Sequence, residues 1–157
     1  MKHFFLATAA MLACATVATP QTMSYGPNIN VETAKKLAAP AIAEARKNSW
    51  NMAVAIVDTA GDLVYFEKMD DTQAGSVQIA QSKARSAARF KRPTKAFQDA
   101  LAAGGEGLRL LALEGAVPVE GGIPLVSGGK IVGAIGASGG TSQQDGVVAQ
   151  AGASALK

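Results

Sequence analysis

The chain is poor in the side chains on which most metal sites and nucleophilic sites depend. Its 157 residues include one histidine, His3, and one cysteine, Cys14. Both lie within residues 1–18, which read as a secretory signal peptide: a basic start at Lys2, a short apolar run and a small-residue cleavage site at Ala18. We therefore expect a mature chain without a zinc site built on His or Cys, an iron–sulfur cluster, a disulfide or a His-dependent catalytic triad.

The same segment indicates a periplasmic or secreted protein. Its apolar run is too short to cross a bilayer, so we expect no membrane span. The sequence Leu12-Ala13-Cys14 leaves lipidation at the cysteine as an alternative. Beyond the signal peptide, residues 19–28 read as a polar leader and residues 29–157 as one compact domain.

Aromatic residues and excess charge are also scarce. Aromatics make up 5% of the chain, and the formal net charge is +3. Loss of Lys2 with the signal peptide leaves 14 basic residues against 12 acidic ones. So small a surplus, with so few stacking side chains, does not predict a nucleic-acid partner.

Hydrophobic periodicity and turn residues predict alternating helices and hairpins. Asn30 is placed to cap the first helix, which Pro40 should kink or split. The expected strands are 52–57, 63–67, 108–113, 123–126 and 130–137, although the Leu-rich composition of 108–113 could also suit a helical turn. The further helices are 76–90, a short one that Thr94 caps and that runs to about residue 102, and one beginning near Thr141. Hairpins rather than βαβ crossovers indicate an α+β fold with a mainly antiparallel sheet of about five strands, flanked by helices.

The run from Gly121 to Asp145 is the most informative stretch. It encodes two strands joined by a glycine turn, followed by Ser138-Gly139-Gly140 and a helix start in which Thr141 and Gln144 have capping-box spacing. Free N–H groups at a helix start attract an anion or a carboxylate. The alternative is that these glycines serve only packing and turns.

The helix expected at 76–90 has two unlike faces. Alanines line one face, which predicts close packing against a sheet or a second copy, and Lys83 falls at the boundary. Arg85 and Arg89 lie on the opposite face, where they could clamp the carboxylates of haem or of a small organic acid. The alternative is a solvated helix face. The Asp58–Asp62 and Asp70-Asp71 segments read as turn formers rather than as metal ligands.

Three blocks in register carry a family resemblance. They are Val54-Ala55-Ile56-Val57-Asp58 with Gly61; Met69-Asp70 followed by 79–87 and Pro93-Thr94; and Gly121-Gly122-Ile123-Pro124 on to Asp145. In this order and spacing the chain resembles the GlcG/HbpS family of haem-binding proteins, which is related to the C-terminal domain of PduO. The resemblance covers nearly the whole mature chain.

The resemblance implies an α/β/α, profilin-like domain that assembles into dimers and often octamers, with haem as the cofactor. It places ligand contacts on the helix containing Lys83 and Arg85, at Thr94, and at Ser138, Gly139 and Gly140. Haem propionates would then meet the arginines, including Arg89.

An iron ligand is the weak point of this expectation, because haem iron normally binds His, Cys, Met or Tyr. Met69 is the candidate thioether, with a gap-filling core role as its alternative. Met23 and Tyr25 are expected in a loose leader. Haem could instead sit in an apolar crevice between subunits, held by contacts between its propionates and arginines.

The sequence therefore predicts an exported protein that binds haem or a related anionic ligand without dedicated catalysis. One alternative is a proton-transfer enzyme acting on a small organic acid, with Asp58, Asp145 or Lys83 as the base. Another is an oligomeric accessory protein for an envelope partner.

Overall fold

The computed structural model describes residues 23–157, so the expected signal peptide, with His3 and Cys14, lies outside the described residues. The elements are α1 (Val31–Lys47), β1 (Ala53–Val57), β2 (Leu63–Lys68), α2 (Ser76–Phe90), α3 (Thr94–Ala102), the 3-10 helix η1 (Gly105–Ala112), β3 (Gly122–Ser127), β4 (Lys130–Ser138) and α4 (Ser142–Ala153). No helix in this range is long and apolar enough to cross a membrane.

The strands form one antiparallel sheet in the order β2-β1-β4-β3. The α+β class with an antiparallel sheet is confirmed, but the sheet of residues 23–157 has four strands and not five. The fifth strand, expected at 108–113, is wrong, because that segment forms most of η1. Positive φ angles at Gly104 and Gly105 turn the chain back against α3, away from any strand that could pair with it.

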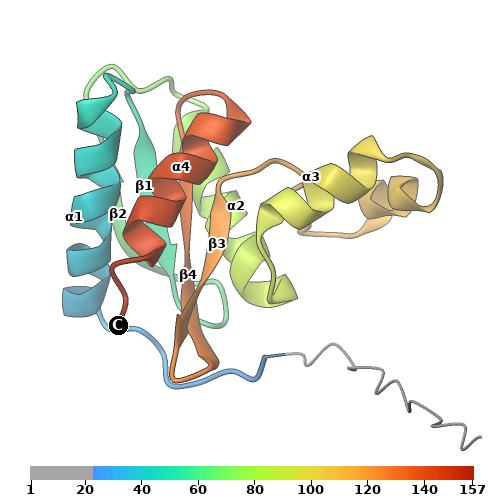
Figure 1. The fold of residues 1–157 in the computed structure, drawn as a ribbon, viewed down its shortest axis with the longest axis horizontal. Coiled ribbons are helices and arrows are strands. Elements are labelled where there is room, and N and C mark those ends of the chain that lie inside the picture. Colours follow the sequence, from blue (N-terminus) through green and yellow to red (C-terminus); the bar gives the residue numbers. More distant parts are fainter. Residues whose placement is uncertain (1–22) are drawn as a thin grey trace, which may run out of the picture.

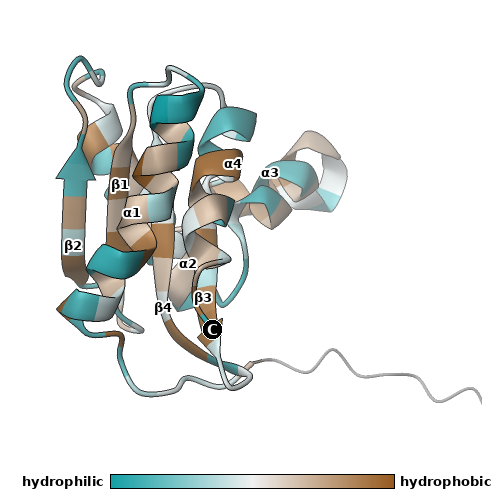
Figure 2. Cartoon of the chain, turned by 60° about the vertical axis from the view of Figure 1, so that its left-hand side comes forward, coloured by the Kyte–Doolittle hydropathy of each residue, from teal (hydrophilic) through white to brown (hydrophobic). Residues whose placement is uncertain are grey.

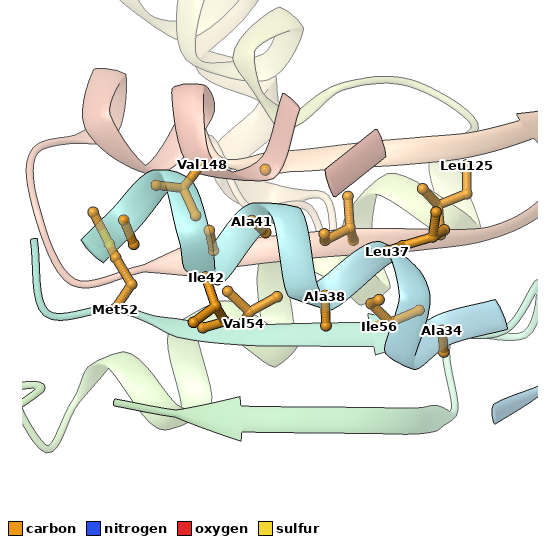
Figure 3. Packing of buried hydrophobic residues seen from close by; sticks show 14 of the residues in the cluster. Ala34, Leu37, Ala38, Ala41, Ile42, Met52, Val54, Ile56, Leu125 and Val148 are labelled. Atoms are coloured by element: carbon orange, nitrogen blue, oxygen red, sulfur yellow. The ribbon is translucent and has the colours of Figure 1, made fainter. Parts of the chain in front are cut away.

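Helices cover both faces of the sheet (Figure 1), with α1 and α4 on one face and α2 on the other. The alternation of β1 fits this layering, since neighbouring side chains of a strand point to opposite faces. Val54 and Ile56 join the core under α1 and α4 (Figure 3), whereas Ala53 and Ala55 face α2. In Figure 2 the central strands are mainly hydrophobic and the ends of α1 hydrophilic.

The alanine face of α2 packs directly on the sheet, as predicted. Ala80 and Ala84 are fully buried against β4. A side chain at Gly136 would come within 2.6 Å of the Ala84 nitrogen, so only glycine allows this approach of helix and strand. Gly136 therefore serves packing, which is the alternative that the sequence left open for these glycines.

The first helix begins as predicted and does not split. The Asn30 side chain accepts a hydrogen bond from the Thr33 amide at 2.8 Å, which caps α1. The helix runs through Pro40 to Lys47, because Ala38 and Ala41 on either side are buried in the same core. Burial of both turns offsets the one backbone hydrogen bond that proline removes.

The segment before α1 is not loose, in contrast to the expectation for Tyr25. The Gly26 amide donates to the Ile131 carbonyl at 2.8 Å, and the Ile29 amide donates to the Val132 carbonyl at 2.8 Å. The Tyr25 hydroxyl donates to the Ala88 carbonyl at 2.9 Å. Residues 24–29 therefore extend the pairing of β4 beyond the end of β1.

Candidate functional site

A buried ion pair lies at the centre of the domain. The Lys83 Nζ, from α2, is 2.6 Å from the Asp145 Oδ2, from the first turns of α4, and the two side chains are only 1% and 4% exposed. Nζ also donates to the Ala137 carbonyl at 3.3 Å. The sequence predicted Lys83 at the boundary between the two faces of the helix, and the structure instead buries it. The burial is possible because a carboxylate 62 residues away in the chain compensates the charge.

The start of α4 holds its own carboxylate. The capping box of Thr141 and Gln144 is confirmed. The Gly140 amide donates to the Asp145 Oδ1 at 3.0 Å. Burial raises the pKa of Asp145 above the ordinary aspartate value, while Lys83 and the amides of Gly140 and Gly139 oppose that rise. The anion that a helix start attracts is here a side chain of the protein itself.

Thr94 joins the same centre from another direction. Its Oγ1 accepts a hydrogen bond from the Gly122 amide at 2.9 Å, and Pro93 rather than Thr94 occupies the N-cap of α3. Gly121 has φ +124°, and a side chain there would lie 2.8 Å from the Asp145 Cβ and 3.0 Å from the Lys83 Nζ. Thr94 and the buried pair therefore meet around two residues that must lack side chains.

On the outer side of this backbone lies a pocket of about 460 Å³, which we call the glycine pocket. It opens between the start of α3, the start of β3 and one side of α4. Its lining residues are Pro93, Lys95, Glu120, Gly121, Gly122, Ile123, Gly146, Val147 and Gln150. Lys83 and Asp145 are not among them, so the ion pair supports the pocket from behind.

Two charged side chains enter the glycine pocket. Lys95 Nζ lies 2.7 Å from an Asp99 oxygen, and this hydrogen bond raises the pKa of Lys95, so its ammonium stays charged. The Glu120 carboxylate lies against Gly146, where any side chain would collide with it. Among residues 23–157, no donor makes a hydrogen bond or ion pair with that carboxylate.

The remaining predicted contact residues lie elsewhere. The Nε atoms of Arg85 and Arg89 donate to the carbonyls of Gly61 at 3.1 Å and Ala60 at 2.7 Å. They thereby hold the β1–β2 turn. The Asp58 Oδ1 accepts from two amides of that turn at 2.9 Å, which confirms its role as a turn former.

Met69 and Ser138 are also apart from the glycine pocket. Met69 packs on the edge of the core and lines a second pocket of about 280 Å³ with Asp70 and Asp71. The Ser138 hydroxyl donates to the Ser76 hydroxyl at 3.1 Å inside the fold. Gly139 passes close to the Asn51 carbonyl, where a side chain has no room. No group of three or more acidic, His or Cys residues in the described range could hold a metal ion.

Sequence reasoning missed most of the pocket lining. Gly146 and Gln150 are four residues apart and share a side of α4 with Val147, a pattern that helix periodicity could have found. Glu120 gave no such signal, because its place in the pocket lining depends on packing against Gly146, which lies in another element.

This fold and site define a class: a three-layer α+β domain whose antiparallel sheet presents a glycine-floored pocket beside a buried Lys–Asp pair. The chain belongs to the HbpS-like family, described as haem-degrading protein HbpS-like, which matches residues 29–154.

Relatives support this assignment. Protein GlcG of Escherichia coli K12 is 36% identical over 110 residues, which cover 70% of this chain and 81% of GlcG. A double mutant of Streptomyces reticuli HbpS is similar in structure, with a TM-score of 0.77, 28% identity, and coverage of 96% of this chain and 99% of that one. A PduOC:heme complex has a TM-score of 0.74 and 26% identity, covering 83% of this chain and 96% of that one.

Proposed function

We propose that this protein binds haem, and that the glycine pocket receives one edge of the macrocycle. Two comparisons support the ligand: the family is described as haem-degrading, and one similar structure is a complex with haem. The observation that carries the location is the pocket itself, which opens beside Thr94 and the buried ion pair.

The shape of the glycine pocket suits a flat apolar ligand. Gly121 and Gly122 form a floor of bare backbone, while Pro93, Ile123 and Val147 supply apolar walls. Val147 is 47% exposed, so a ligand could bury a substantial apolar surface there. The volume falls within the range typical of small-molecule sites. When bound, haem would supply the iron chemistry, and these residues would bind and orient it.

The charges suit a ligand whose carboxylates point outward. The Lys95 side chain is 51% exposed, and its ammonium is paired with Asp99. A propionate would therefore compete with the Asp99 carboxylate for that ammonium. The predicted propionate contacts of Arg85 and Arg89, and the contacts of Met69 and Ser138, stay predictions. Replacing both arginines by glutamine weakens haemin binding if that prediction holds.

Haemin titration followed by absorbance tests the proposal. We expect Val147→Asp to weaken binding about tenfold or more, since losing the burial of a valine costs about 1.5 kcal/mol or more. Val31→Asp is the matched control, because Val31 is 44% exposed but lies on α1. Wild-type protein that leaves the haemin spectrum unchanged would refute haem binding. Equal affinities of both variants would move the site elsewhere.

Binding without dedicated catalysis is the proposed activity. It is supported by the ion pair, because two of the three groups considered as a base in the proton-transfer alternative, Lys83 and Asp145, are paired and lie behind the pocket floor. The third, Asp58, accepts hydrogen bonds from two amides of the β1–β2 turn. Repeated spectra of the complex with ascorbate and oxygen would distinguish binding from degradation: persistence of the Soret band indicates binding alone, and its bleaching indicates turnover.

We also propose that the protein is exported and assembles with copies of itself. Export rests on residues 1–18, and mass spectrometry of protein recovered from the cell envelope should give a chain beginning at Thr19. Self-assembly rests on the arm formed by α3, η1 and the return to Val119, which projects from the domain (Figure 1). No residue of η1 is buried, and Leu108 and Leu111 are 54% and 71% exposed. A second copy covering them would explain why so apolar a helix stands in solvent.

A further inference from the structure

We propose that the arm of a second copy closes the glycine pocket, with Leu108 and Leu111 of the partner subunit as the side chains that cover it. This inference rests on the proposed self-assembly and deepens it, because it names the surface that receives the arm. The pocket would then be built by two chains. An edge of a haem would lie between the glycine floor of one chain and the leucines of the other.

The composition of the arm is the first support. No residue of 98–119 is buried, although this run includes Leu108, Leu110, Leu111 and Leu113. The run is ordered into α3 and η1, and it projects from the domain (Figure 1). Exposed apolar surface of this extent marks an interaction site.

The 3-10 geometry of η1 directs two of the leucines outward. A side chain at Gly107 would collide with the Ala100 carbonyl, so that side of η1 faces α3. Because a 3-10 helix has three residues per turn, Leu110 shares the side of Gly107, and both are only partly exposed. Leu108 and Leu111 stack in another column, where they are 54% and 71% exposed. They form a ridge, which we call the leucine ridge, that no part of its own chain covers.

The glycine pocket offers a surface of matching character. Gly121, Gly122 and Gly146 leave bare backbone in its lining, beside the apolar side chains of Ile123 and Val147. Val147 is 47% exposed, and the other large apolar side chain of α4, at Val148, is buried in the core. A leucine ridge laid over this hollow would remove Val147 and the leucines from water together.

The placement of the two surfaces allows both copies to be covered at once. The first residues of α3, Pro93 and Lys95, line the glycine pocket, and the same helix leads into the arm. Each copy therefore carries a pocket at the root of its arm and a leucine ridge at the far end. A two-fold exchange of arms would cover two pockets and two ridges and leave no further site open, which is the closed arrangement typical of dimers.

The charges beside the leucine ridge favour a protein over an anionic bilayer as the occupant. The segment holds two acidic residues, Glu106 and Glu114, against one basic residue, Arg109. Helices that lie on membranes are rich in lysine and arginine, because the bilayer surface is negative.

Arg109 gives the contact its polarity. It adjoins the leucine ridge and is 69% exposed, and its pair with Glu106 at 2.6 Å is on the surface, where such pairs contribute little. In the glycine pocket, the Lys95 ammonium is paired with Asp99. Glu120 has no ion-pair partner within residues 23–157. Arg109 of the partner subunit would supply one as the leucines settle over the pocket.

Cysteine cross-linking between two different variants tests the docking directly. Leu111→Cys and Val147→Cys are prepared separately, each with Cys14→Ser so that the introduced thiol is alone in its chain. We expect the mixture to give a disulfide-linked dimer on mild oxidation, because a disulfide forms only where the two Cα atoms come within about 7 Å. Val31→Cys in place of Val147→Cys is the matched control, since Val31 is 44% exposed but lies on α1.

Charge reversal tests the polar contact. Arg109→Glu and Glu120→Arg each place like charges in both contacts of a two-fold dimer, so each should raise the dissociation constant about tenfold or more. An equimolar mixture should regain the wild-type value, because opposite charges meet again at both contacts of the mixed dimer. Sedimentation over a dilution series measures the constants. Glu32→Arg is the control, since Glu32 is 72% exposed on α1.

The outcomes separate this inference from the proposals beneath it. If Leu111→Cys links to itself and not to Val147→Cys, arm meets arm, and the docking on the glycine pocket is refuted while self-assembly stands. Mixed charge variants that stay dissociated would refute the contact between Arg109 and Glu120. A wild type that is monomeric at every concentration would refute self-assembly and this inference together. None of these measurements uses haemin, so haem binding is tested independently.

Discussion

Replacing Lys83 by methionine should destabilise the fold in a pH-dependent way. Methionine has a similar length and keeps the packing of α2 on the sheet, but it leaves the Asp145 carboxylate buried without its cation. Breaking a buried pair in this manner typically costs about 3–5 kcal/mol.

This cost has a ceiling, because the buried carboxyl can take up a proton and become neutral. From the ordinary value of 3.8, protonation at pH 7 costs about 4.4 kcal/mol, at 1.36 kcal/mol per pH unit. The Gly140 amide still favours the ionised form, so we expect a loss of about 3–4 kcal/mol at pH 7. At pH 5 the same reasoning gives a ceiling of about 1.6 kcal/mol.

The direction of the pH dependence follows from proton linkage. Burial already raises the pKa of Asp145 in the folded wild type, and loss of Lys83 raises it further. Between the unfolded and folded pKa values, the folded chain holds a proton that the unfolded chain has lost. The free energy of unfolding therefore falls as pH rises through that window, and this contribution is fully present only below the unfolded value.

Urea unfolding of wild type, Lys83→Met and Lys83→Met/Asp145→Asn at pH 5 and pH 7 measures these effects at one protein concentration. The double variant keeps the acceptor for Gly140 but has no buried charge, so it should recover most of the loss and lose the added pH dependence. A single variant with the same loss at both pH values would refute the reasoning. So would a double variant as unstable as the single one at pH 7.

Two further predictions concern the pocket floor and the arm. Gly121→Ala should cost about 2–4 kcal/mol in urea unfolding, because the new methyl group would meet the Ala137 carbonyl and the Asp145 Cβ at 2.8 Å and φ is +124°. Gly128→Ala is its control, since φ is +56° there but nothing lies within 4 Å; we expect a cost of about 1 kcal/mol, and equal losses would contradict the steric account. Leu111→Glu should reduce the molar mass seen by light scattering, whereas Leu63→Glu, at a leucine 48% exposed on β2, should not. The reverse result would place the interface between copies on the edge of the sheet.

Local patterns in the sequence predicted most of the elements. The bounds of α2 and α3, the Asn30 cap and the Thr141 capping box are confirmed because each depends on residues a few positions apart. The strand expected at 108–113 is wrong for the opposite reason. Its apolar residues fit a strand, but a strand requires a partner, and the arm carries this segment away from the sheet.

The candidate site could not be read in the same way. The sequence by itself determined that His3 and Cys14 are the only residues of their types, that a basic helix exists and that a glycine-rich hairpin leads into a helix start. Only the tertiary structure decided that Lys83 is buried against Asp145, that Arg85 and Arg89 hold a turn, and that Glu120 lies over Gly146. The physical reason is that burial and pairing of charge depend on which surfaces meet across the whole chain, whereas caps and periodicity depend on near neighbours.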